Sequence, residues 1–318
     1  MRRAALVLCL GLAAAFTAAG CGLGGGDEGG TGDGVTLRVT EDFGSERVAR
    51  SSEARVPQGD TVMRLLQRKL DVQTRYGGTF VQALEGRPGG RQDGRPVDWF
   101  LYVNGIESEI GGAEFKLSPG DRVWWDLHDW GAAMRIPAVV GSFPEPFKSG
   151  YRGKRIPVRI ECAQPRAREC DEVAQRLEGA GVEGTSRSVL SQREEGGVLR
   201  VLVGRWTELR LDPTARELEG GPERSGVYAR FDAAGRRLTV LDPRGRPART
   251  LTSGAGLVAA TRQGDARPTW VVTGTDAVGL AAAAAALDES LLTQRFAIAI
   301  ENGQAVPAPV TVPGVGSP

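Results

Sequence analysis

The chain has 318 residues, with 40 Lys and Arg against 39 Asp and Glu, and a single His. This near-neutral balance excludes a general electrostatic grip on nucleic acid, which needs a concentrated basic surface. One His excludes zinc sites built from several imidazoles and mechanisms that need two of them. Hydrophobic residues at 41% and charged residues at 25% are typical of a globular protein, and the length suggests about two domains.

The first twenty residues have the features of a signal peptide. Two arginines precede an apolar run over residues 4–16, which is too short to cross a bilayer of roughly 30 Å. Small residues then lead into Cys21, an arrangement that resembles the lipobox of bacterial lipoproteins, in which the Cys becomes the acylated N-terminus. We expect residues 1–20 to be removed and Cys21 to be lipidated. Simple cleavage and secretion is the alternative, because Ala18 stands where the lipobox prefers Leu.

Residues 21–34 are expected to form a lipidated, Gly-rich tether. Eight of the thirteen residues 22–34 are Gly, and such a segment cannot bury enough apolar surface to fold. A flexible chain of this length reaches roughly 20 Å. The leader and tether together predict a protein anchored by lipid at the extracytoplasmic face of the cell membrane.

Cys162 and Cys170 are the cysteines that remain after Cys9 leaves with the leader and Cys21 is acylated. In an oxidising compartment the simplest prediction is one local disulfide between them. A redox pair or half of a metal site is the alternative. We disfavour it because no third or fourth soft ligand lies nearby in the sequence, and we expect no metal.

Residues 35–131 are predicted to form an α+β domain. Alternating residues in 35–43 predict a strand with a hairpin partner in 46–56, and Gly59-Asp60-Thr61 precedes a helix with apolar residues at helical spacing. Further strands are predicted at 79–86, 98–105, 114–117 and 122–130, with a polar loop at 87–96. A helix lying across a mixed sheet with hairpins at both ends indicates a β-grasp-like fold.

Short motifs give this domain a resemblance to a known family. Residues 99–105 read WFLYVNG, residues 111–113 read GGA, and residues 117–124 read LSPGDRVW. The combination resembles a bacterial domain family of unknown function that is similar to the C-terminal β-grasp domain of transcobalamin. The resemblance implies a β-grasp fold and a domain that closes over a corrinoid, although the helical barrel that holds most of the corrinoid there has no counterpart in this sequence. We therefore expect no cofactor, and the resemblance suggests a cobalamin-like or other flat molecule as ligand.

The strand at 122–130 carries the candidate binding residues, because alternation along a strand places every second side chain on one face. One interpretation is a ligand face on which Trp rings stack and an acid and an imidazole orient polar groups. Its residues, with two from the neighbouring strand, are Trp124, Asp126, His128, Trp130, Tyr102 and Asn104. The other interpretation is a strand packed beneath the following segment, with His128 hydrogen-bonded and inert.

The rest of the chain is predicted to hold a second domain. Residues 132–154 are rich in Pro and aromatic residues and should wrap along one or both domains. Strands alternate with helices over 155–302, which predicts an α/β domain with a mixed or partly parallel sheet. Residues 254–259 (GAGLVA) match a dinucleotide-binding pattern, but too few residues follow for the helix it needs. The Pro-rich segment 303–318 is predicted to be disordered.

The sequence contains no HExxH, GxSxG, SxxK or P-loop motif, so we expect a protein that is not an enzyme. The favoured function is a membrane-anchored, extracytoplasmic module that binds a small molecule or a partner protein, and no nucleic acid. The alternatives are a structural or assembly protein of the cell envelope and an envelope glycan hydrolase. The hydrolase would need two carboxylates about 5 to 10 Å apart in a cleft.

Overall fold

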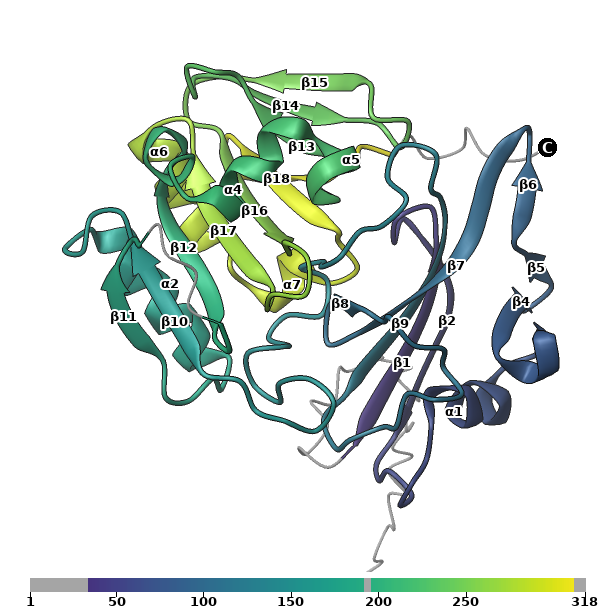
Figure 1. Ribbon diagram of the computed structural model, residues 1–318. Coiled ribbons are helices and arrows are strands. Elements are labelled where there is room, and N and C mark those ends of the chain that lie inside the picture. Colours follow the sequence, from purple (N-terminus) through teal and green to yellow (C-terminus); the bar gives the residue numbers. More distant parts are fainter. Residues whose placement is uncertain (1–33, 192–195, 312–318) are drawn as a thin grey trace, which may run out of the picture.

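The computed structural model describes residues 34–191 and 196–311 (Figure 1). Two large sheets lie against each other, one built from the first third of the chain and one from the second half. The predicted combination of α+β elements with mixed sheets is confirmed. The signal peptide, Cys21, the tether up to residue 33 and the last residues of the tail lie outside the described residues, so those assignments stay predictions.

The first sheet, called here the N-terminal sheet, has the strand order β2-β1-β9-β7-β6, and β8 pairs with β7. The bounds are β1 (Val35–Glu41), β2 (Glu46–Glu53), β6 (Gly90–Gln92), β7 (Arg95–Val103), β8 (Ile106–Glu107) and β9 (Arg122–Asp129). The parallel pair is β1 with β9, at the centre, and the flanking pairs are antiparallel. The predicted mixed sheet is therefore present in this part of the chain.

One face of the N-terminal sheet is covered by α1 (Val62–Lys69). Thr61 caps this helix by accepting a hydrogen bond from the Arg64 N–H, which decides between Asp60 and Thr61, the two cap residues that the sequence offers. The apolar side chains Val62, Leu65 and Leu66 are buried, and they share a core with the inward residues of β1, β7 and β9. Burial of this apolar face holds the helix on the sheet.

A small second sheet lies beside α1. Its elements are β3 (Val72–Arg75), η1 (Tyr76–Gly78), β4 (Phe80–Leu84) and β5 (Arg87–Pro88). The Trp99 indole N–H donates to the Arg87 carbonyl over 3.0 Å, which fastens β5 to β7. The polar loop predicted at 87–96 was therefore wrong in part, because it contains β5 and β6. The strand predicted at 114–117 was also wrong, since only Lys116 forms a bridge there, with Thr61.

The second large sheet, called here the C-terminal sheet, has the order β11-β10-β12-β17-β16-β18-β19. The first four strands are parallel, and the rest are antiparallel. The bounds are β10 (Val158–Cys162), β11 (Ser186–Val189), β12 (Leu199–Arg205), β16 (Gly256–Thr261), β17 (Thr269–Gly274), β18 (Ala297–Glu301) and β19 (Gln304–Ala308). The predicted disulfide between Cys162 and Cys170 is confirmed.

The two faces of the C-terminal sheet are covered by different elements. On one face lie α2 (Arg168–Gly179), α6 (Ala277–Ala285) and α7 (Glu289–Leu292). On the other lie the segments between β12 and β16, namely α3 (Trp206–Leu209), α4 (Pro213–Arg216), η2 (Glu217–Gly220), α5 (Pro222–Ser225) and the sheet of β13 (Ala229–Phe231), β14 (Leu238–Leu241) and β15 (Pro247–Leu251). No helix among the described residues has the length and apolar character needed to span a bilayer.

Two predictions for the C-terminal part can be compared with the structure, and one of them is corrected. Residues 254–259 open no helix, as their spacing predicts, and Gly256 instead begins the fully buried strand β16. The tail is not disordered from residue 303 onward, because residues 304–308 form β19 and the Val310 N–H donates to the Leu241 carbonyl. Pairing with β18 overrides the composition, and Pro307 is tolerated because β19 is the edge of the sheet.

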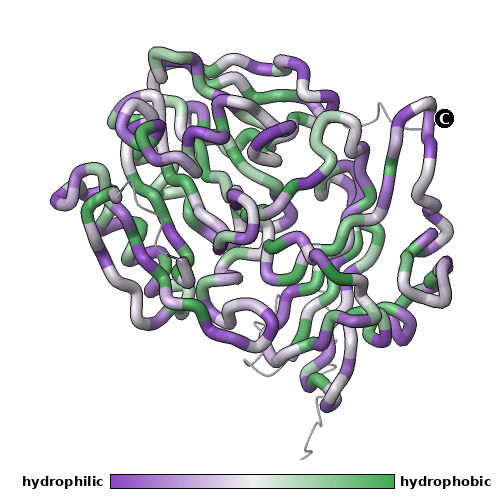
Figure 2. Tube along the Cα trace, viewed as in Figure 1, coloured by the Kyte–Doolittle hydropathy of each residue, from purple (hydrophilic) through white to green (hydrophobic). Residues whose placement is uncertain are grey.

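Residues 132–154 pack into both cores, as expected. Ile136 and Val139 belong to the cluster that faces the N-terminal sheet, while Phe143 and Phe147 belong to the cluster on the α2 side. Figure 2 shows the hydrophobic stretches concentrated along the inner strands of the two sheets and the hydrophilic ones in the outer turns. The large sheets therefore share buried side chains, and the exact domain boundaries stay predictions.

Candidate functional site

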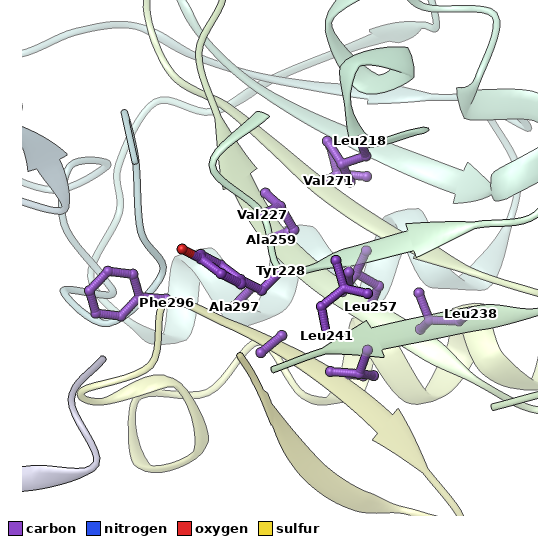
Figure 3. Close-up of a cluster of buried hydrophobic side chains, with 14 of the residues drawn as sticks. Leu218, Val227, Tyr228, Leu238, Leu241, Leu257, Ala259, Val271, Phe296 and Ala297 are labelled. Atoms are coloured by element: carbon purple, nitrogen blue, oxygen red, sulfur yellow. The ribbon is translucent and has the colours of Figure 1, made fainter. Parts of the chain in front are cut away.

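The face predicted to bind a ligand lies between the two large sheets. Trp124, Asp126 and His128 share one face of β9, and the paired residues of β7 place Tyr102 on the same face. These side chains are between 0% and 2% exposed. Tyr228 and Phe296 of the C-terminal part cover them, and both lie in the buried cluster shown in Figure 3. The structure thus brings the predicted residues together and covers them with the second sheet.

Asp126 is the centre of a buried hydrogen-bond network. Its carboxylate accepts from the backbone N–H groups of Phe43, at 3.1 Å, and Gly44, at 2.8 Å, and also from the Thr40 hydroxyl. The same carboxylate lies 2.8 Å from Nδ1 of His128. The Trp124 indole N–H donates to the Thr40 hydroxyl at 2.6 Å. A buried carboxylate with this many partners fixes the turn between β1 and β2 against β9.

The ring of His128 lies between aromatic side chains. It stacks on Phe100 at 4.3 Å between ring centroids and lies 4.6 Å from Phe43, with Phe296 edge-on at 5.3 Å. Within the described residues, neither His128 Nε2 nor the Tyr102 hydroxyl has a hydrogen-bond partner. Burial raises the pKa of Tyr102 well above its usual value. The hydroxyl therefore stays protonated and carries no charge into this core.

Asn104 serves the fold instead of facing a cavity. Its side-chain amide donates to Asp121 at 2.9 Å and to the Gly150 carbonyl at 2.8 Å, and its oxygen accepts from the Arg122 N–H. Asn104 also has a positive φ of 54°, as a tight turn before Gly105 requires. The VNG and PGD motifs are thus joined by a direct hydrogen bond, which is a structural reason for both motifs.

Trp130 follows the last residue of β9 and is only half-buried. It is the member of the predicted set that remains partly open to solvent. A binding role for the whole set stays a prediction. In this arrangement a flat ligand could reach Trp124 and His128 only if the two sheets separated.

An open cleft lies on the face of the N-terminal sheet that points away from the C-terminal sheet, opposite to the face of Asp126 and His128. Its volume is about 260 Å³, and it is lined by β4, β7, β9 and the loop over residues 107–112. The aromatic residues of its lining that belong to this side of the structure are Phe80, Trp99 and Trp125. At its mouth, Tyr76 is 79% exposed and packs edge-on against Phe80 with 6.2 Å between ring centroids.

The cleft contains hydrogen-bond donors without acceptors. Trp125 is 5% exposed, and its indole N–H has no partner among the described residues. The backbone N–H of buried Gly112 likewise donates to no group in the described chain. A Cβ atom on Gly112 would lie 3.3 Å from the Trp125 ring, so glycine lets the loop approach the indole closely. Unpaired buried donors of this kind favour a ligand that supplies an acceptor.

Two carboxylates also line the cleft, and arginines hold both. Glu109 lies 2.7 Å from Arg262 and 3.6 Å from Arg135, and the charge of Arg262 lowers its pKa. Glu107 lies 3.7 Å from Arg135, and burial raises its pKa. Both acids are therefore already engaged with cations of this chain.

The sequence carried a signal for this cleft that the alternation pattern did not reveal. Alternation along residues 122–130 puts Trp125 on the face away from the predicted site, and the Gly-Gly-Ala segment enters the sequence analysis only as part of a motif. Alternation identifies which side chains share a face, but not which loop returns to cover them. The cleft exists because the loop before Gly112 folds back, where the Gly112 carbonyl accepts from the Met63 N–H at 2.8 Å.

Residues 59–129 match the model of DUF4430, a domain of unknown function. Every residue that lines the cleft falls inside this DUF4430 segment. No curated protein matches the chain. A solved structure from Ruminococcus gnavus ATCC 29149, of a protein proposed to bind metal, is similar at 14% identity over 30% of this chain and 97% of that chain, with a TM-score of 0.24. Across residues 34–191 and 196–311, no three His, Cys, Asp or Glu side chains are grouped so as to hold a metal.

Replacing Asp126 with Ala should lower the free energy of unfolding by about 3 to 5 kcal/mol, because it leaves buried donors of Thr40, Phe43 and Gly44 unpaired. Urea unfolding followed by Trp fluorescence measures the change. The matched control is Asp265→Ala, at an exposed position that forms no ion pair with any residue the structure describes, and it should shift stability by less than about 0.5 kcal/mol. Equal effects of the two substitutions would contradict a central role for Asp126.

Asp121 should make stability fall as the pH rises through the weakly acid range. Burial raises its pKa to about 6 in the folded chain, so the protonated form is favoured by folding. The protonated carboxyl adds to the free energy of unfolding, fully below about pH 4, and this added stability is lost by about pH 6. The free energy of unfolding falls by up to about 3 kcal/mol over this range. Urea unfolding at several pH values should show a shallower decline in Asp121→Asn than in the native chain. Identical slopes for the two proteins would be inconsistent with this assignment.

Proposed function

We propose that this chain is a non-catalytic binding protein held at the extracytoplasmic face of the cell membrane by lipid on Cys21, and that the cleft in its DUF4430 segment is the binding site. The leader, the residues before Cys21 and the Gly-rich tether support the location. The disulfide between Cys162 and Cys170 supports an oxidising compartment.

The unpartnered indole N–H of Trp125 carries the proposal of a binding site. A buried donor without an acceptor costs roughly 1 to 3 kcal/mol, and a ligand oxygen placed in the cleft would recover that free energy. The surrounding aromatic side chains supply apolar contact, and the N–H of Gly112 supplies a second donor. The best fit is an apolar or planar group that bears a carbonyl or amide oxygen.

The size of the cleft limits what it can hold. At about 260 Å³ it is smaller than the sites of roughly 300 to 1,000 Å³ that enclose drug-sized molecules. A flat macrocycle of the corrinoid kind would therefore be held by one edge, through an amide group on its rim, with Tyr76 and Phe80 contacting the part that remains outside. A cobalamin-like ligand thus remains part of the proposal, with only its edge in the cleft.

A protein partner is the second candidate, because Tyr76 and Phe80 form an exposed aromatic pair at the mouth of the cleft. Exposed aromatic side chains beside a pocket are common anchors in protein interfaces. An assembly role in the envelope would place a side chain of the partner in the cleft. The two candidates can be told apart by mass, because one predicts a bound small molecule and the other a bound protein.

Native mass spectrometry of the full-length protein, extracted in detergent from its own membranes, tests the proposal. The native chain should retain a small molecule, and Trp125→Phe should lower its occupancy at least tenfold because it removes the indole donor. Trp206→Phe is the control, since the Trp206 indole N–H is also buried without a partner among the described residues but lies outside the cleft. Equal occupancy in Trp125→Phe and Trp206→Phe would overturn the site, retention of a protein would favour the second candidate, and turnover of the ligand would overturn a non-catalytic role.

A further inference from the structure

The C-terminal sheet has a crevice of its own at the carboxyl ends of its parallel strands. The chain leaves β10 for β11 on one side and later returns to β12 on the other side of β10. The connection after β10 leads to α2 on one face of the sheet, and the connection after β12 leads to α3 on the opposite face. Ligands of open α/β sheets bind at such points, because diverging connections leave a gap between them.

A cavity is present at this point. Its volume is about 170 Å³, and its lining comes from the β10–α2 connection, the β12–α3 connection and the first turns of α6. The two connections meet at Gly204, where a Cβ atom would lie 2.6 Å from the Ala163 Cβ. The disulfide ties the end of β10 to the first turn of α2, so it fixes one wall of the crevice.

The lining combines an apolar body with a polar end. Val203, Leu280, Ala167 and Ala277 supply apolar surface. At the polar end, α2 begins without a side-chain cap, and the Glu169 N–H donates to no group in the described residues. The charges at the rim are Arg205, which is paired with Glu208 at 2.9 Å, and Glu169, which makes no ion pair with any described residue.

We propose that this crevice binds a small, mostly apolar molecule with a neutral carboxamide head. The carbonyl oxygen would accept from the free N–H groups at the start of α2, and the amide N–H would donate to the Glu169 carboxylate. An anionic head is disfavoured because Glu169 and Glu208 both carry negative charge at the rim. A cavity of about 150 Å³ is known to hold benzene, so a single six-membered ring matches the available volume. The site is separate from the DUF4430 cleft and does not depend on it.

Titration of 4-fluorobenzamide with the full-length protein in detergent, followed by ¹⁹F NMR and corrected for detergent alone, tests this site. Ala277→Leu places a larger side chain in the crevice and should weaken binding at least tenfold. Val278→Leu is the matched control in the same helical turn, at a position 70% exposed and outside the lining, and should leave binding unchanged. 4-Fluorobenzoate should bind at least tenfold more weakly than the amide.

Several results would overturn the proposal. Absence of saturable binding to the native chain, or an equal loss in Ala277→Leu and Val278→Leu with both proteins folded, would remove the site. Equal affinity for the benzoate would remove the assignment of a neutral head. Loss of binding in Trp125→Phe would show that the probe occupies the DUF4430 cleft. Binding retained by the Trp125→Phe protein supports the crevice, whether or not the cleft has a ligand of its own.

Discussion

The buried carboxylate of Asp126 is the constraint on which the rest of this structure depends. It lies between two sheets with no access to water, so every donor around it must be supplied by the chain. The backbone of the turn between β1 and β2 supplies two of them, and Phe43 in that turn packs against Tyr228 and Phe296 of the C-terminal part. A Cβ on Gly44 would lie 2.2 Å from the Gln294 carbonyl oxygen, so the two parts of the chain touch at this turn.

This contact packs the two large sheets against each other, and the two candidate binding sites lie away from it. The aromatic layer of Phe43, His128 and Phe296 occupies the space between the sheets. The DUF4430 cleft opens on the other face of the N-terminal sheet, and the crevice opens at the carboxyl edge of the C-terminal sheet. Both candidate sites are therefore built on rigid elements, with the buried layer fixing their relative orientation.

The sequence predicted the local elements better than their surroundings. Alternation correctly grouped Trp124, Asp126 and His128 on one face, because a strand has a fixed period of two residues. It could not show that Tyr228 and Phe296, about 100 to 170 residues later, would cover that face, since long-range packing leaves no periodic trace. The strand β16 was missed for a related reason: its Gly- and Ala-rich sequence is suited to tight packing against α6, where a Cβ on Gly256 would lie 2.5 Å from the Gly279 carbonyl oxygen.

Chemical labelling of His128 tests the buried layer most directly, because His128 is the one His in the chain, so the absorbance of the carbethoxyhistidine product reports on this position alone. The modification rate by diethyl pyrocarbonate should be measured on the folded protein across a series of urea concentrations below the unfolding transition. With the imidazole 2% exposed, we expect labelling only through global unfolding, at a rate that follows the free energy of unfolding. Modification of the native protein at the rate of a free imidazole, independent of urea, would contradict the account and would show that the face is open to ligands.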